Sequence, residues 1–176
     1  MKTAQSVTIP ATIDGSVFTR FALFDTFKMK KRWKNPLIFT LIMTGFAIIC
    51  LAVKNTHEDA ALLGGVLLAC AFVLPAVWYF MFMLSVRGQI KKNGLSATKA
   101  QYFVMLKEEK IRVVKGKEEI EHDWADAHMA YRVKGCIYLY VSTARAYLMP
   151  DGKDSEAAWE IISQCLPKEK LCDRRK

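Results

Sequence analysis

The stretch NPLIFTLIMTGFAIICLAV, residues 35–53, contains no Asp, Glu, Lys or Arg. A second uncharged run, AALLGGVLLACAFVLPAVWYFMFMLSV, covers residues 60–86. A helix rises about 1.5 Å per residue, so about 18 or more apolar residues reach across a hydrocarbon core of about 30 Å. We therefore expect two transmembrane helices, at residues 36–53 and 60–86, joined by an extracytoplasmic loop at residues 54–59.

Two other interpretations of the apolar runs are less favoured. A pair of buried helices in a soluble protein usually keeps a polar face, and these runs are uncharged over their whole length. A cleavable signal peptide has its apolar core close to a basic start, whereas the first run begins only near Pro36, after a segment with Asp14 and Asp25. Both runs are therefore expected to stay in the protein as membrane spans.

Basic residues flank the two runs unequally. The loop at residues 54–59 has one Lys against two acidic residues, whereas the outer flanks are strongly basic. Because Lys and Arg beside a span are kept on the cytoplasmic side during insertion, we expect a multi-pass inner-membrane protein with both termini in the cytoplasm. The same side chains suit anionic lipid headgroups. They are Lys28, Lys30, Lys31, Arg32, Lys34, Arg87, Lys91 and Lys92.

The whole chain is basic, with a formal net charge of +9 and a pI near 9.4. Such a balance can indicate nucleic-acid binding, but here the excess charge gathers beside the apolar runs and not on an aromatic-rich soluble face. No nucleic-acid partner is therefore expected.

Small residues recur along the second run at Ala61, Gly65 and Ala69. Every-fourth spacing places them on one stripe of a helix, where small side chains permit close helix packing. The expected partner is the first helix, and a homodimer through the same stripe is the alternative. Pro75 removes one backbone donor and is expected to kink the second helix. Neither span contains Asp, Glu, His, Lys or Arg, which argues against an ion pathway.

The rest of the chain predicts a β domain at residues 101–176, joined to the spans by a connector at residues 87–100. A change of periodicity after residue 154 predicts an amphipathic closing helix, capped near Asp154 and stopped by Pro167. Residues 1–35 predict a strand, at residues 5–10, followed by a phenylalanine-rich helix, and we expect that strand to join the C-terminal sheet. The six expected strands of the β domain are QYFVMLK (101–107), KIRVVKG (110–116), EIEHDW (119–124), AHMAYRV (127–133), CIYLYV (136–141) and AYLMP (146–150).

The order of these parts resembles the YcxB-like membrane proteins, in which a transmembrane hairpin precedes a domain similar to a bacterial pleckstrin-homology (PH) fold. The resemblance lies in Trp124 after an acidic strand, in CIYLYVSTARAYLMP (136–150), and in the helix SEAAWEIISQCLP (155–167). It implies an α+β membrane protein of the bacterial inner membrane, with a cytoplasmic PH-like antiparallel β domain closed by a C-terminal helix. The family has no established reaction.

The segment EIEHDWADAH, residues 119–128, gathers carboxylates and two histidines. In a strand, Glu119 and Glu121 face one way while His122 and Trp124 face the other, so a solvated acidic face is favoured over a metal site. Five cysteines without a Cys-x-x-Cys spacing fit a reducing cytoplasm. The chain also lacks a glycine-rich phosphate loop and a Gly-x-Ser-x-Gly elbow, and we expect no catalytic residue, metal or cofactor.

These expectations combine into a non-enzymatic membrane protein that presents a PH-like domain at the inner leaflet, for interaction with lipids or with an unknown protein. Its possible interaction surface consists of Trp124, Tyr138 and Tyr140, although a core position is the favoured interpretation for the two tyrosines. Two alternatives are a membrane immunity protein against a toxin or bacteriocin and an accessory subunit of a transporter.

Overall fold

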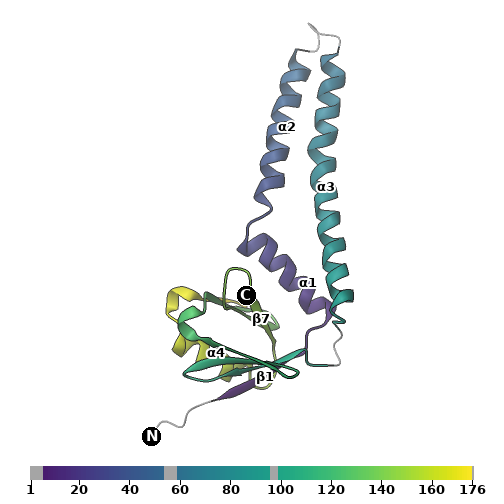
Figure 1. The fold of residues 1–176 in the computed structure, drawn as a ribbon. Coiled ribbons are helices and arrows are strands. Elements are labelled where there is room, and N and C mark those ends of the chain that lie inside the picture. Colours follow the sequence, from purple (N-terminus) through teal and green to yellow (C-terminus); the bar gives the residue numbers. More distant parts are fainter. Residues whose placement is uncertain (1–5, 54–58, 96–98, 176) are drawn as a thin grey trace. The chain divides into compact units, whose positions relative to one another are not determined.

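The computed structural model describes residues 6–53, 59–95 and 99–175. The chain forms two compact units, one made of residues 1–17 and 94–176 and one made of residues 18–93. The first unit is a β domain and the second is helical (Figure 1). The chain therefore begins in the β domain, leaves it to build the helical unit, and then returns.

The first sheet of the β domain is a four-stranded antiparallel meander in the order β1-β2-β3-β4. It confirms the expectation that the N-terminal strand joins the C-terminal sheet, because β1 pairs with β2 and places Ile9 opposite Val104. Apolar residues at alternate positions point into the core. The strands are β1 (Val7–Ala11), β2 (Tyr102–Leu106), β3 (Lys110–Lys115) and β4 (Glu118–Asp123).

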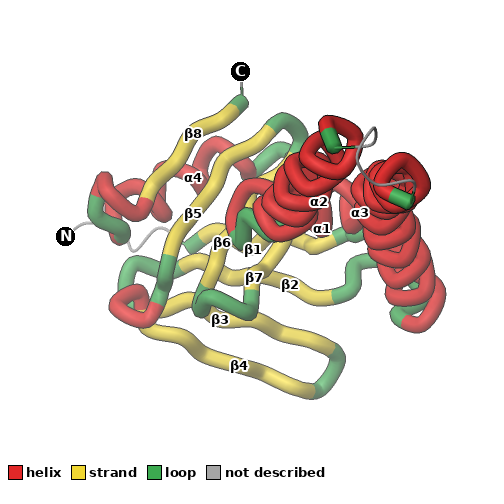
Figure 2. Tube along the Cα trace, turned by 90° about the horizontal axis from the view of Figure 1, so that it is seen from above, coloured by secondary structure: helices red, strands yellow, loops and turns green. Residues whose placement is uncertain are grey.

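The second sheet has the order β7-β6-β5-β8 (Figure 2). Strands β5 (Met129–Val133), β6 (Cys136–Tyr140) and β7 (Ala146–Pro150) are antiparallel neighbours at the expected positions. Strand β8 (Leu171–Arg174) was not expected, and it pairs parallel to β5. Its sequence, LCDR, has only four residues, with two apolar residues followed by two charged ones, so it has no alternation from which a strand can be predicted. The prediction of a fully antiparallel β domain is therefore wrong at the edge where β8 pairs with β5.

Helix α4 (Ser155–Cys165) packs against the core through Ala158, Ile161 and Ile162. The expected side-chain cap from Asp154 is absent from this described helix end. The Ser155 hydroxyl instead accepts a hydrogen bond from the Gly152 backbone N–H at 2.6 Å, which ties the helix to the turn after β7. Short 3₁₀ turns at Trp124–Asp126 and Lys168–Lys170 complete the unit.

The helical unit contains two long helices, α2 (Lys34–Ala52) and α3 (Ala60–Lys92), which run side by side (Figures 1 and 2). They follow α1 (Gly15–Leu23), which continues into a π-helical turn at Phe24–Met29. Both long helices match the expected apolar runs, but α3 extends through the first part of the predicted connector. It also continues through Pro75 as one uninterrupted helix.

Candidate membrane interface

The two long helices expose most of their apolar side chains. Leu62, Phe72 and Leu41 are 72%, 65% and 64% exposed, and many other large apolar side chains on these helices are at least half exposed. A core helix of a soluble protein would be mostly buried. By length and composition, both helices are suited to cross a membrane.

The seam between α2 and α3 is lined by small residues, but not by those expected. Ala47, Gly64 and Ala71 are buried, and a Cβ atom placed on Gly64 would lie 2.9 Å from the Leu51 Cγ atom and 3.3 Å from the Ala47 carbonyl oxygen. Close backbone approach therefore occurs at Gly64.

The predicted packing stripe of Ala61, Gly65 and Ala69 is wrong as a contact with α2. All three residues are exposed, and a Cβ atom on Gly65 would meet nothing within 4 Å. A different set of small residues on α3, made of Ala60, Gly64 and Ala71, is buried, and Gly64 is the position that approaches Leu51 and Ala47 of α2.

A hydrogen bond joins α2 to α3 at the proline. Pro75 has no N–H, so it leaves the carbonyl of Ala71, four residues earlier, without its helical donor. The Thr40 hydroxyl lies 3.0 Å from that Ala71 carbonyl oxygen and also 3.0 Å from the carbonyl oxygen of Pro36 in its own helix. A threonine on the neighbouring helix thus supplies the donor that the proline removes.

The predicted headgroup-binding residues are all exposed, in the segment that leads into α2 and in the last part of α3. Some have partners: the Lys30 ammonium lies 2.6 Å from the Asp25 carboxylate, and the Lys28 ammonium lies 5.9 Å from the centroid of the Phe24 ring. The set is Lys28, Lys30, Lys31, Arg32, Lys34, Arg87, Lys91 and Lys92.

An aromatic cluster lies close to these cations. The Phe27 ring makes edge contacts with three rings of α3, at centroid distances of 6.1 Å to Trp78, 6.4 Å to Tyr79 and 6.1 Å to Phe82. Trp and Tyr are enriched where membrane proteins cross from hydrocarbon to headgroups. One end of the hairpin therefore combines aromatic rings with basic side chains.

The candidate interaction surface on the β domain is wrong, because its three aromatic residues are buried. Trp124 is 8% exposed and its indole N–H donates to the Lys107 carbonyl oxygen at 2.8 Å. Tyr138 and Tyr140 are 3% and 1% exposed. Aromatic composition alone does not distinguish a binding face from a second buried face of a strand.

The acidic strand β4 has the side-chain alternation that the sequence predicts. Glu119 and Glu121 both form ion pairs with Arg112 on β3, at 2.7 Å each. Lys110 and Arg112 hydrogen-bond to Glu121 and hold the pKa of this exposed carboxyl below its usual range. His122 lies on the other face, with its ring nitrogen 2.9 Å from the Tyr147 hydroxyl. Among the described residues there is no cluster of three metal-ligating side chains.

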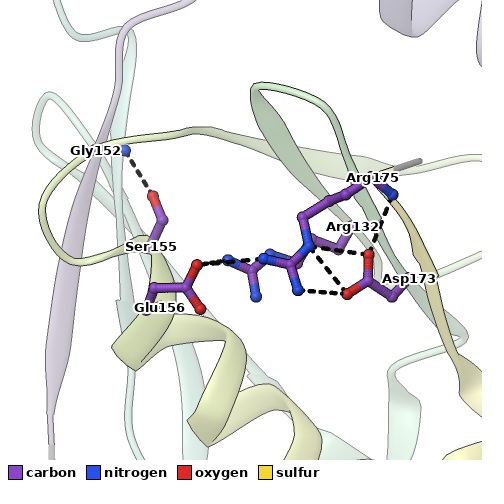
Figure 3. Close-up of polar contacts among 6 residues, drawn as sticks. All are labelled: Arg132, Gly152, Ser155, Glu156, Asp173 and Arg175. Carbon is purple, nitrogen blue, oxygen red and sulfur yellow. Dashed lines mark hydrogen bonds and ion pairs between the residues drawn. The ribbon is translucent and has the colours of Figure 1, made fainter.

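A network of ion pairs around the buried Arg132, which the sequence does not predict, joins β5, β8 and α4 (Figure 3). The Arg132 side chain is only 5% exposed and pairs with Glu156 in the first turn of α4, while Trp159 lies 5.7 Å from its guanidinium carbon. The hydrogen bond from Arg132 is the main reason that the pKa of Glu156 is lowered. Arg175 pairs with Asp173 at 2.8 Å and lowers the pKa of Asp173.

The network contains as many cations as carboxylates, so its charges are balanced. Arg175 also lies 3.4 Å from Glu156, which links the end of the chain to α4. These contacts act as a structural latch, because they hold β8 against α4. They are not arranged as a site for an anion.

A search of protein-family models, curated proteins and solved structures finds no match to this chain.

Proposed function

We propose that this chain is an integral membrane protein, whose α2–α3 hairpin crosses the bilayer twice and anchors the β domain at the membrane surface. The apolar side chains exposed on both long helices carry this proposal. In water they would form a large unfavourable surface, whereas lipid tails would solvate them. The hydrogen bond from Thr40 to Ala71 supports it further, because unpaired carbonyls are costly in hydrocarbon.

The pairing of β1 with β2 supports an even number of crossings. These strands lie on opposite sides of the hairpin in the sequence, yet they are neighbours in one sheet. The segments before α2 and after α3 must therefore lie on the same side of the membrane. The basic residues at both of these helix ends favour the cytoplasmic side.

The β domain supports the PH-like and YcxB-like interpretation through its order of elements. A four-stranded meander is followed by three antiparallel strands and a closing helix. On this basis the protein is a non-enzymatic component of a bacterial inner membrane, which presents a PH-like domain to lipids or to a protein partner. The basic residues around α2 and α3 would bind anionic headgroups, each contributing about 1 kcal/mol near a charged leaflet.

The exposed series Ala61, Gly65 and Ala69 favours a second role for α3. Because these small residues do not contact α2, they remain available to another transmembrane helix. A second copy of this chain or a larger transporter could supply that helix. No structural feature among the described residues favours the immunity-protein alternative.

The topology is tested by expressing the full chain in a bacterial host, with alkaline phosphatase or green fluorescent protein fused after its last residue. The proposal expects the chain to stay in the membrane fraction after extraction. The green fluorescent protein fusion should fluoresce, and the alkaline phosphatase fusion should be inactive. A further fusion within residues 54–59 should show phosphatase activity. Recovery of the untagged chain in the soluble fraction would contradict the proposal.

A further inference from the structure

A cleft of about 480 Å³ opens within the helical unit, between the segment that leads into α2 and one face of α3. None of the described residues that line it carries a carboxylate. Its walls combine hydrogen-bonding groups with aromatic rings, which is the lining expected for a ligand with a polar end. The residues that the argument uses are Thr26, Arg32, Asn35, Trp78, Phe82 and Ser85.

Arg32 is placed at this cleft by the backbone before α2. Its N–H donates to the Thr26 carbonyl oxygen at 3.0 Å, and the Lys34 N–H donates to the Lys31 carbonyl oxygen at 3.1 Å. Between them Lys31 has φ of 48°, a left-handed conformation that reverses the chain. The Arg32 guanidinium has no carboxylate partner among the described residues, since nearby Asp25 pairs with Lys30.

The other polar groups at the cleft are also able to donate hydrogen bonds. The Ser85 oxygen accepts from Gln89 at 3.4 Å, which leaves its own proton to donate. Asn35 lies in the first turn of α2, which has no acidic residue and no side-chain cap. The positive end of the helix dipole therefore adds to the charge of Arg32. Together these donors suit a phosphate group, which arginine binds through two parallel hydrogen bonds.

A second, apolar cleft of about 290 Å³ adjoins the first, because Asn35 and Trp78 line both. Its remaining walls come from Pro36 and Phe39 of α2 and from Leu74 and Pro75 of α3. This lining offers almost no hydrogen-bonding group to a ligand. A molecule that fills both clefts must therefore be polar at one end and apolar at the other.

We propose that these adjoining clefts bind one phospholipid with a negatively charged headgroup, with its phosphate against Arg32 and an acyl chain between Phe39 and Leu74. The inference rests on the proposed membrane insertion, which would place Arg32 at headgroup level. It goes beyond a general attraction of basic residues to lipid, because it assigns the lipid phosphate to one side chain, that of Arg32.

The test uses the full-length protein in detergent and native mass spectrometry, with phosphatidylglycerol, phosphatidylcholine of the same chains, and glycerol phosphate as probes. Arg32→Gln is compared with Arg20→Gln, which removes the same guanidinium charge from an exposed residue of α1 that belongs neither to the clefts nor to the headgroup-binding set. Arg32→Lys retains the charge without the planar fork, and circular dichroism checks that each variant keeps its helices.

The inference expects bound phosphatidylglycerol to fall about tenfold in Arg32→Gln and about twofold or less in Arg20→Gln, with an intermediate loss in Arg32→Lys. Equal losses in the two glutamine variants, or equal retention of phosphatidylcholine by the parent protein, would overturn it. Glycerol phosphate bound as tightly as the lipid would also overturn it, because the apolar cleft would then contribute nothing. Membrane fractionation of the same variants reports separately on the proposed anchoring.

Discussion

The hydroxyl group of Tyr102 exchanges two hydrogen bonds with the backbone of Leu148. It accepts the Leu148 N–H at 2.8 Å and lies 3.2 Å from the Leu148 carbonyl oxygen, to which it donates. Tyr102 belongs to β2 in the first sheet, and Leu148 belongs to β7 at an edge of the second. One side chain thus takes the place of a neighbouring strand and joins the two sheets. Burial raises the pKa of this phenol well above its usual range, so it remains protonated and able to donate.

Replacement of Tyr102 by Phe should destabilise the β domain by about 1–3 kcal/mol, because the Leu148 N–H would lose its partner in a buried position. Urea unfolding of the detergent-solubilised chain, followed by near-ultraviolet circular dichroism, measures this loss. Tyr79→Phe is the matched control, since its hydroxyl has no hydrogen-bond partner among the described residues and its side chain is exposed. Similar midpoints for both variants would contradict the assigned role of Tyr102.

Thr40→Val should weaken the α2–α3 hairpin by about 1 kcal/mol, because the Ala71 carbonyl would lose its donor. The loss should shrink in a Pro75→Ala background, where the residue-75 N–H can donate to Ala71 within the helix. Titration of micelles with sodium dodecyl sulfate, followed by far-ultraviolet circular dichroism, measures both effects. If the cost of Thr40→Val were the same with and without Pro75, the two residues would not be coupled.

Gly64→Val should disrupt the hairpin, whereas Gly65→Val should leave it folded. The two changes add the same side chain to adjacent positions of one helix and share the same intrinsic helix cost. Only at Gly64 does the added Cβ atom approach Leu51 and the Ala47 carbonyl oxygen. The expected difference is about 1–3 kcal/mol, from overpacking.

The same micelle titration distinguishes the two valine variants. Loss of dimer in Gly65→Val, seen by chemical crosslinking in the membrane, would support the homodimer alternative for the exposed series. Equal destabilisation of the two variants would contradict the observed seam.

Glu156→Gln should reduce the acid sensitivity of the β domain. The pKa of Glu156 is lower in the folded protein than in the unfolded chain, so its stabilising effect is present above the ordinary glutamate value of about 4.3. The effect is lost as the pH falls through that range toward the folded-state pKa. Because the Glu156 side chain is 76% exposed, solvent screening keeps the effect small, even though Arg132 is buried.

The acid dependence is measured by urea midpoints at neutral and at acid pH. Glu160→Gln is the control, because Glu160 lies on the same helix and pairs with no cation among the described residues. An unchanged slope of stability with pH in Glu156→Gln would rule out the latch as the source of acid sensitivity.

Strong local patterns explain which parts of the fold the sequence predicts. Uncharged runs of 19 and 27 residues predict α2 and α3, and β-forming residues that alternate or run together predict the strands from β2 to β7. Strand β8 has no such pattern, because its position depends on a parallel partner and on the contacts of Asp173 and Arg175. The end of α3 is also not marked by composition, since the helix continues past the change to charged residues after Val86 and ends at Lys92.

The candidate site is less well predicted because its decisive contacts cross between elements. Spacing along α3 permits two small-residue stripes, and only the position of Leu51 on α2 shows that Gly64 faces the seam. The donor role of Thr40 depends on a proline in another helix. Arg32 is identifiable as one of several basic residues, but its place at a cleft follows from the turn around Lys31.

The pairing of β1 with β2 has a consequence for biosynthesis. Residues 7–11 leave the ribosome first, but their hydrogen-bonding partner, residues 102–106, is made only after the whole hairpin. The first strand therefore keeps an edge open to wrong pairing until both helices have been synthesised. Under the proposed membrane insertion of α2 and α3, completion of the sheet would therefore mark the end of that insertion. A nascent chain stalled before residue 102 should remain sensitive to protease at its N-terminal strand, whereas one stalled beyond the C-terminus should be protected.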